Sequence, residues 1–337
     1  MRFLSDNAAT ACAEVLDAVI AANAVTDGSY DGDRITQGLD AVFGEFFGRD
    51  CRVFAVGTGT AANALGLAAI CPSHGAVVCH EEAHIHVDEC GAPEFFTGGA
   101  KLLLAGGDAG KITPATLERA MASMRGDVHQ VVPSALSLTQ ATEYGTAYAP
   151  AEVAALADIA HARGWRVHMD GARFANALLH LGCHPGDVTW RAGVDVLSFG
   201  FIKNGGMSAE ALVFFDVEAA AKVPYLKKRA GQMPSKGRFA AAQLVAMIES
   251  GVWQRNARAA NDGALRLAAA APARVIHPVE ANELFVRLTA AEKARLRAAG
   301  ADFYDWGAAD DDLARLVVAW DTPADAIGRF AAALAGL

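Results

Sequence analysis

The stretch PAEVAALADIAHARGWRVHMDGAR (150–173) carries the signals that decide the fold class. Its first part has the composition of a helix and ends at Gly164, a residue that commonly terminates helices. Its second part, WRVHMD (165–170), is a short run that predicts a strand ending on Asp170. A helix that leads directly into a strand is the repeating unit of a parallel sheet covered by helices on both faces.

The same alternation extends over most of the N-terminal two thirds of the chain. It predicts an α/β protein with a mainly parallel sheet in a large domain over residues 1–245. Polar residues follow the apolar runs at VHMDGAR and SFGFIKNGG, and ligands bind at this end of the strands in such sheets. The expected strands span 51–56, 76–80, 101–105, 129–138, 165–170 and 194–201.

The pattern changes after about residue 240, where a small α+β C-terminal domain over residues 246–337 is expected. One long helix over about 239–271 joins the two domains. Strands at ELFVRL (283–288) and RLVVAW (315–320) and helices over 290–299 and 324–337 follow it.

Composition and charge exclude several classes of protein. The chain has 337 residues, of which 53% are hydrophobic, so disorder is excluded; its low content of Gly (33) and Pro (11) excludes fibrous structure. No apolar run approaches the roughly 20 residues of a membrane-spanning helix, and MRFLSDNAAT lacks the apolar region of a signal peptide. With a net charge of −9 and one short basic cluster at 227–229, nucleic acid is not an expected partner. We expect a soluble cytoplasmic protein that binds no membrane.

The six cysteines indicate a reducing compartment. None forms a C-x-x-C pair, and most lie in apolar surroundings. We therefore interpret them as small buried hydrophobic residues and not as a disulfide or zinc framework.

Lys203 differs from the other lysines of the chain because it ends the apolar run VLSFGFI and precedes Asn-Gly-Gly. Partial desolvation there would lower the pKa of its amine, as a Schiff-base nucleophile requires. The alternative is a strand-end lysine that reaches solvent.

Asp170 and Arg173 follow another strand in HMDGAR. The carboxylate could pair with a cationic ring nitrogen, and the guanidinium could reach an adjacent oxyanion. The alternative is that Asp170 caps the following helix.

Gly57-Thr58-Gly59-Thr60 predicts a turn at the start of a helix, where backbone N–H groups can hold a phosphate. As a dinucleotide fingerprint it is weak, because Ala62 stands where the third glycine would be. A single-phosphate site fits better.

His84 and His129 are candidates for an imidazole that stacks on an aromatic cofactor or accepts a proton. Either could instead be an ordinary surface or core histidine. His84, His86 and Asp88 alternate as ligands on one strand face would, but nothing elsewhere in the sequence supplies a matched ligand, so no metal is expected.

Together, a phosphate cup, a stacking histidine, an Asp-x-x-Arg and a desolvated lysine at the ends of parallel strands are what pyridoxal 5′-phosphate requires. A nicotinamide-dependent oxidoreductase and a catalytically inactive binding protein are the alternatives from other classes.

The sequence resembles the threonine aldolase family of fold-type-I pyridoxal-phosphate enzymes over essentially its whole length. CGAPEFF, AGQMPSK and PVEANELF are most similar to the branch of low-specificity L-threonine aldolases and phenylserine aldolases. The matching motifs are FLSDN (3–7), YDGD (30–33), GTGTAAN (57–63), AH (83–84), HQVV (129–132), SLTQATEYG (137–145), HMDGAR (168–173), SFGFIKNGG (198–206) and ARLVVAWD (314–321).

The resemblance implies roles in cofactor binding. Lys203 forms the internal imine with pyridoxal phosphate. Asp170 binds the pyridine nitrogen, and Arg173 lies near the ring hydroxyl. Thr58, Gly59 and Thr60 hold the phosphate, and His84 stacks on the ring.

It also implies roles toward the substrate. His84 and His129 are placed for the β-hydroxyl, and Arg315, helped by Ser5, binds the carboxylate. The implied reaction cleaves L-threonine, L-allo-threonine or phenylserine to glycine and an aldehyde. A β-eliminating lyase or another fold-type-I enzyme is the alternative. The family forms homodimers or homotetramers with shared sites, so Tyr30 or Lys228 would serve a neighbouring subunit.

Two positions depart from the family pattern. Ile202 stands where Ser or Thr commonly precedes the lysine, so we expect cofactor binding weaker by about 1.5–3 kcal/mol, one hydrogen bond to a charged group. SLTQATEYG replaces a Glu-Asn-Thr pattern, which leaves the contact beyond the ring open.

Overall fold

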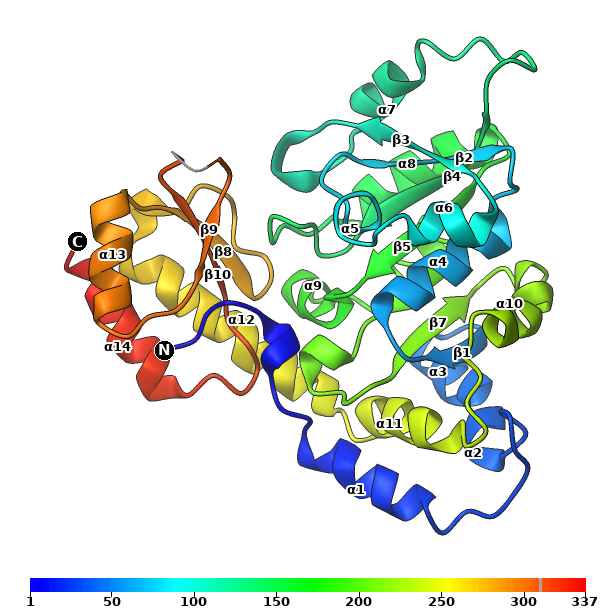
Figure 1. Ribbon diagram of the computed structural model, residues 1–337, viewed down its shortest axis with the longest axis horizontal. Coiled ribbons are helices and arrows are strands. Elements are labelled where there is room, and N and C mark those ends of the chain that lie inside the picture. Colours follow the sequence, from blue (N-terminus) through cyan, green and yellow to red (C-terminus); the bar gives the residue numbers. More distant parts are fainter. Residues whose placement is uncertain (309–310) are drawn as a thin grey trace.

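The computed structural model describes residues 1–308 and 311–337, and its largest element is a seven-stranded sheet (Figure 1). The strand order is β1-β7-β6-β5-β4-β2-β3. The strands are β1 Arg52–Val56, β2 Gly75–His80, β3 Lys101–Ala105, β4 Val132–Thr139, β5 Arg166–Gly171, β6 Val196–Phe199 and β7 Glu210–Phe214.

The expected α/β class with a mainly parallel sheet is confirmed. The strands β3, β2, β4, β5 and β6 pair in parallel, and β7 runs antiparallel to both of its neighbours, β6 and β1. All residues of β2, β6 and β7 are buried, as strands covered on both faces must be. The five parallel strands end on one edge of the sheet, and the site described below lies there.

Helices cover both faces of this sheet (Figure 1). On one face α4 contacts the central strands and is flanked by α6 and α10; α3, α7, α8, α9 and α11 contact strands from the other side. Their bounds are α3 Leu39–Phe47, α4 Gly59–Ile70, α6 Ala92–Thr97, α7 Pro114–Met121, α8 Pro150–Ala162, α9 Phe174–Leu181, α10 Val223–Arg229 and α11 Arg238–Glu249.

A second, three-stranded antiparallel sheet with the order β8-β10-β9 builds a separate core (Figure 1). The long helix α12 leads into it and packs against α14. The N-terminal segment also joins this core, because Phe3 is fully buried and its ring lies 4.6 Å from that of Phe330. The elements are α12 Val252–Ala270, β8 Glu283–Arg287, α13 Ala290–Ala298, β9 Tyr304–Trp306, β10 Leu313–Val317 and α14 Ala324–Ala335.

The remaining helices are short or lie at the N-terminus. They are α1 Ala13–Ala22, α2 Arg34–Gln37 and α5 His84–Val87.

Two local expectations are wrong. The single helix over 239–271 is two helices, because Gly251 has φ +69 and ends the first before α12 begins. The fourth strand begins at Val132 and not at His129, because Asp127 accepts hydrogen bonds that form a turn with the N–H groups of His129 and Gln130. The expected domain boundary at 245/246 falls inside α11.

Among the described residues, no helix combines the length and apolar character needed to cross a membrane.

Candidate active site

A cavity of about 310 Å³ lies at the carboxyl ends of the parallel strands. Its volume is at the lower end of the range for small-molecule sites, roughly 300–1,000 Å³. It brings together six of the residues predicted from sequence: Thr58, Gly59, Thr60, His84, Asp170 and Lys203. Its other lining residues are Asn7, Asn63, Glu89, Glu143, Ala172, Ile202 and Glu210.

Lys203 lies in a single 3₁₀ turn, Ile202–Asn204, that follows β6. The residue before the turn fixes its position, because Phe201 is fully buried and its ring lies 4.2 Å from that of Phe199. Gly205 has φ +103, and a Cβ there would meet the Asn256 amide at 2.6 Å. Among the described residues no hydrogen-bond or ion-pair partner is recorded for the Lys203 amine. A fixed backbone thus presents an unpaired amine to the cavity.

Glu210, the first residue of β7, holds the same turn from the side. Its carboxylate accepts hydrogen bonds from the backbone N–H groups of Phe201 and Ile202. Burial raises the pKa of Glu210 to about 7, although these two N–H groups and the charge of Lys203 oppose the shift.

Asp170 is held in place by two donors. Its carboxylate accepts from the backbone N–H of Ala172 at 3.0 Å and from the side-chain amide of Asn63 at 2.7 Å. Helix α9 begins at Phe174 with Arg173 at its N-cap, so the alternative role of Asp170 as the cap of this helix is excluded. The side chain is 3% exposed, and what exposure remains faces the cavity that it lines.

His84 is oriented by a buried carboxylate. Its Nδ1 lies 2.8 Å from Glu89, whose side chain is fully buried, and Asn63 donates to the same Glu89 oxygen at 2.8 Å. Asn63 therefore links His84 through Glu89 to Asp170. The hydrogen bond to Glu89 raises the pKa of His84, against the opposing effect of burial, and the charges of Asp170 and Glu143 add to the increase.

Ligand atoms of His84, Glu89 and Asp170 lie within 4.8 Å of one another, a spacing that a cation could accept. The Asn63 amide, however, donates to both carboxylates. The shared donor and the hydrogen bond between His84 and Glu89 orient all three side chains without a cation, so we interpret the cluster as one that orients the imidazole.

Thr58, Gly59 and Thr60 form the N-terminus of the 12-residue helix α4. The Thr58 hydroxyl caps the helix by accepting from Ala61 N–H at 3.1 Å. The N–H groups of Gly59 and Thr60 belong to the first turn and have no acceptor within the helix. With the helix dipole they make this end of the cavity attractive to an anion.

Arg173 is buried and already paired. Its Nε and Nη2 donate to Asp6 at 2.8 and 2.9 Å, and its Nη1 lies 3.4 Å from Glu283. Burial alone would raise the pKa of Asp6, but Arg173 and Lys203 outweigh it and lower that pKa to about 2. The guanidinium predicted to reach a ring hydroxyl therefore has a carboxylate of this chain on each of its edges.

Arg315 and Ser5 are not among the residues that line the cavity. Arg315, on β10, donates to Glu283 from Nη2 at 2.6 Å and from Nε at 3.0 Å. Ser5 is the N-cap of the short 3₁₀ turn Asp6–Ala8 and lines a different depression, at the chain's N-terminus.

His129 does not lie beside His84 within one chain. It is exposed and precedes β4, whereas the cavity lies beyond the opposite end of that strand. Eight strand residues at about 3.3 Å each separate the two ends by roughly 25 Å.

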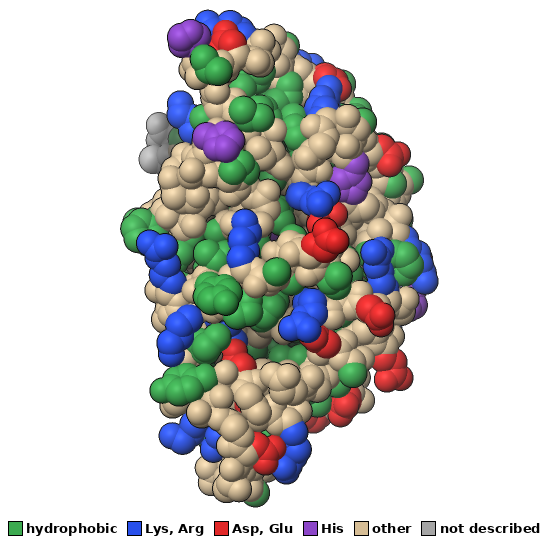
Figure 2. Space-filling view, turned by 90° about the vertical axis from the view of Figure 1, so that its right-hand side faces the viewer, with side chains coloured by type: hydrophobic (Ala, Val, Ile, Leu, Met, Phe, Trp, Pro, Cys, Tyr) green, Lys and Arg blue, Asp and Glu red, His purple; other side chains and the backbone are tan. Residues whose placement is uncertain are grey.

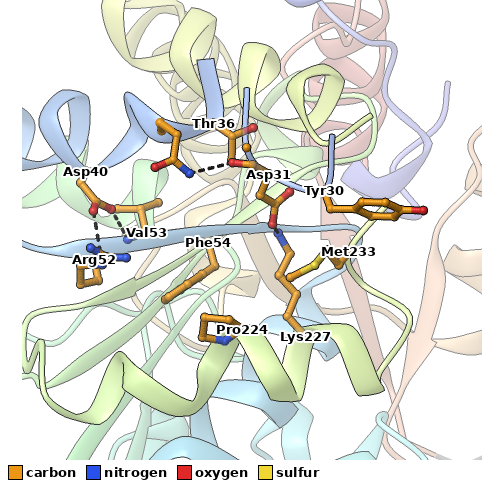
Figure 3. Close-up of a pocket in the computed structure, with 12 residues that line it drawn as sticks. Tyr30, Asp31, Thr36, Asp40, Arg52, Val53, Phe54, Pro224, Lys227 and Met233 are labelled. Carbon is orange, nitrogen blue, oxygen red and sulfur yellow. Dashed lines mark hydrogen bonds and ion pairs between the residues drawn. The ribbon is translucent and has the colours of Figure 1, made fainter. Parts of the chain in front are cut away.

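Tyr30 is also not among the residues that line the cavity. It is 53% exposed, has φ +52, and carries the Lys228 amine 4.3 Å above its ring. Figure 3 shows the aromatic ring pointing away from a second cavity, of about 270 Å³, in which Lys227 pairs with Asp31 at 2.5 Å.

Sequence reasoning missed several acids and one amide that complete the site. Asn63 interrupts an otherwise apolar helix and Glu210 begins an otherwise apolar strand, and these positions are a signal that could have found them. Glu89 follows His84 by five residues with no such signal. Glu143 lies in SLTQATEYG, and burial raises the pKa of its carboxyl.

Comparisons with known proteins agree with the geometry. The family model described as beta-eliminating lyase matches residues 2–291. A low-specificity L-threonine aldolase of Pseudomonas aeruginosa is 43% identical over 98% of this chain and 96% of its own length. A second one, from Pseudomonas sp. (strain NCIMB 10558), is 41% identical over 95% and 93%. The solved structure of a Leishmania major threonine aldolase superposes with a TM-score of 0.92 at 26% identity, covering 99% of this chain and 98% of the other.

Proposed function

The chain belongs to the beta-eliminating lyase family, and we propose that it is a pyridoxal-phosphate-dependent L-threonine aldolase. It cleaves L-threonine, L-allo-threonine or related β-hydroxy-α-amino acids such as phenylserine into glycine and an aldehyde. The two Pseudomonas relatives are named for this activity and align with nearly the whole chain.

One observation carries the proposal: an unpaired lysine amine, a fixed carboxylate and the first turn of a helix line a single cavity. These are the donors and acceptors that the aldehyde, ring nitrogen and phosphate of the cofactor need. Two buried oxygens beside the cavity, Asn63 Oδ1 and Glu89 Oε2, have no hydrogen-bond partner among the described residues, which is consistent with a site built for a polar ligand.

The cofactor, when bound, would accept the electron pair released as the Cα–Cβ bond breaks. Lys203 would attach it covalently, and the N–H groups of Gly59 and Thr60 would bind its phosphate with the Thr58 hydroxyl. Asp170, fixed by Asn63 and Ala172, would keep the ring nitrogen protonated. Arg173, held by Asp6, would lie near the ring hydroxyl.

His84 would stack on the ring and take the proton of the substrate β-hydroxyl, directly or through water. Its Nδ1 faces Glu89, so Nε2 is the nitrogen available for this proton. Glu89 stabilises the imidazolium that forms when the proton arrives, as the carboxylate of a catalytic triad does.

The substrate carboxylate would be bound by Arg315, with Ser5 nearby. The predicted role of His129 requires a second copy of the chain, because His129 precedes β4 and lies roughly 25 Å from the end of that strand at which the cavity lies. The resemblance likewise implies that Tyr30 serves the site of a neighbouring subunit.

We therefore expect a homodimer or homotetramer with shared sites. The face that includes α6 and α10 supports this: Phe95 and Tyr225 are 77% and 80% exposed there. Figure 2 shows hydrophobic side chains interspersed with Lys and Arg over this face. Small-molecule amino acids are the expected substrates, nucleic acid is not an expected partner, and the expected location is the cytoplasm.

Product analysis tests the function. The purified enzyme with pyridoxal phosphate is incubated with L-threonine, L-allo-threonine, phenylserine and, separately, L-serine. We expect glycine in equimolar amount with acetaldehyde or benzaldehyde. Pyruvate and ammonia from L-serine without glycine from the other three substrates would instead indicate β-elimination and overturn the proposal.

A further inference from the structure

Four charged side chains, of which three are buried and Arg315 is partly buried, form a continuous chain that ends on the small sheet. Asp6 binds Arg173 at 2.8 and 2.9 Å, Arg173 lies 3.4 Å from Glu283, and Glu283 binds Arg315 at 2.6 and 3.0 Å. The charges alternate, so two carboxylates face two guanidinium groups. The chain begins in the N-terminal segment, passes through the loop after β5, and ends on the small sheet.

Strand register explains how Glu283 reaches Arg315. In the antiparallel pair β8–β10, Glu283 is opposite Val317 and Arg315 is opposite Phe285. Glu283 and Arg315 are therefore diagonal neighbours on one face of the sheet, where long side chains can meet.

Glu283 is fully buried, which makes its contacts decisive. One carboxylate oxygen, Oε2, accepts both hydrogen bonds from Arg315, and the other, Oε1, has no hydrogen-bond partner among the described residues. An isolated buried carboxylate is costly unless cations compensate it, and here the nearest cations are the two arginines. Glu283 is thus confined to the position between them.

Arg315 is fixed on two sides. Glu283 occupies its Nε and Nη2 edge, and the Trp306 ring lies 5.5 Å from the guanidinium carbon. No hydrogen bond from Nη1 is recorded among the described residues. A guanidinium whose rotamer is already fixed loses less entropy when it binds an anion.

We propose that Glu283 is a positioning residue for substrate binding, which orients Arg315 so that its Nη1 receives the α-carboxylate of the amino acid. This inference rests on the proposed function, in which Arg315 binds that carboxylate. It assigns no contact between Glu283 and the substrate.

A competing role for Glu283 would predict the opposite effect on substrate binding. If Glu283 competed with the substrate for Arg315, removing its charge would strengthen substrate binding. If Glu283 orients Arg315, removing its charge weakens binding.

Glu283→Gln separates the two roles. A glutamine has the same shape but presents one oxygen and one NH₂ group, so one of the two arginines then faces a donor. In the holoenzyme we expect KM for L-threonine and the dissociation constant of glycine, measured by calorimetry, to rise on the order of 10-fold, the loss of one charge-assisted hydrogen bond. We expect kcat to change less than about 3-fold, because a uniform loss of binding leaves kcat unchanged.

A double-mutant cycle tests whether Glu283 acts through Arg315. In an Arg315→Lys background, Glu283→Gln should add less than about 2-fold to KM, since coupled residues are non-additive. Glu292→Gln removes a carboxylate that pairs with Arg274 on the same small domain, and it should leave glycine binding unchanged.

Three outcomes overturn the inference: tighter glycine binding by Glu283→Gln, unchanged binding, or fully additive effects with Arg315→Lys. Glu283→Asp, which keeps the charge, should recover part of the affinity, and a thermal melt identifies a variant that fails to fold. If wild-type enzyme releases no glycine from any β-hydroxy-α-amino acid, the proposed function fails instead.

Discussion

The cavity above the large sheet and the charged face of the small sheet use polar side chains in opposite ways. In the cavity, Lys203 and the first N–H groups of α4 have no partner among the described residues, while Asn63 and Glu210 fix the groups around them. On the small sheet, both Glu283 and Arg315 are engaged by an opposite charge. The cavity thus leaves the Lys203 amine and the helix N-terminus unpaired, whereas the arginine expected to bind the substrate is oriented by an ion pair.

The largest effect on activity is expected when the unpaired amine of Lys203 is removed. Lys203→Ala should lower kcat for L-threonine cleavage by more than about 10³-fold, the scale of losing a covalent catalytic group. Lys101→Ala, an exposed lysine on β3, is the matched control and should retain wild-type activity. Wild-type turnover by Lys203→Ala would show that the reactive group lies elsewhere.

The two arginines should respond differently to the same substitution. Arg315→Lys should raise KM for L-threonine by about 10- to 100-fold, because a lysine lacks the planar guanidinium group that Glu283 holds in one orientation. Arg173→Lys should instead lower the melting temperature, because it leaves Asp6 and Glu283 underpaired in a buried position. Steady-state kinetics and thermal melts of both variants check this, and equal KM effects without a difference in stability would contradict it.

Glu210 is the acid of the cavity whose ionisation should destabilise the fold. Its pKa is raised by burial from 4.5 to about 7, so the folded state holds its proton more tightly than the unfolded state does. Stability conferred by this proton is present below pH 4.5 and is lost as the pH rises toward 7. Relative to wild type, Glu210→Gln should therefore gain up to about 3 kcal/mol between pH 5 and pH 8. Denaturant unfolding at both pH values measures this gain, and a difference that does not vary with pH would refute it.

Glu89 should set the pH range in which His84 accepts a proton. The pKa of His84 is raised mainly by its hydrogen bond to Glu89, so Glu89→Gln should lower it. A base works only when unprotonated, and the acidic limb of the kcat/KM profile should therefore move to lower pH. Asp88→Asn, at the exposed residue just before Glu89, is the control. An acidic limb that stays in place would remove His84 as the base.

The smallest effect is expected at Ile202. A hydroxyl introduced by Ile202→Thr could donate a hydrogen bond to the cofactor phosphate. The Glu210 carboxylate, which lies 3.4 Å from the backbone nitrogen of residue 202, would compete with the phosphate for this hydroxyl. We expect release of the cofactor on dialysis to slow several-fold. This effect is smaller than that of a hydrogen bond to a charged group without a competing acceptor, which contributes about 1.5–3 kcal/mol. Absorbance of the dialysed enzyme follows the release, and an unchanged rate would mean that position 202 does not contribute.

The sequence was informative wherever a site residue directly follows a strand. Asp170 and Lys203 each end an apolar run, and parallel strands bring those ends together, so their meeting in one cavity was predictable. His129 was predicted to open a strand over 129–138, but Asp127 binds its N–H in a turn and the strand begins three residues later, at Val132.

The partners of the site were harder to predict than the site residues. Glu283 and Arg315 are separated by 32 positions and meet only through the β8–β10 register. Asn63 binds Glu89, 26 positions away, and Asp170, 107 positions away. Such contacts depend on tertiary packing, which local sequence patterns do not encode.

The role of Lys203 is tested most directly by identifying the residue that carries the cofactor. The purified holoenzyme is treated with borohydride, digested, and mapped by mass spectrometry. We expect the pyridoxyl-phosphate mass on the peptide containing Lys203 and its loss in Lys203→Ala. Modification of a different lysine, or of the Lys203→Ala protein to the same extent, would contradict it.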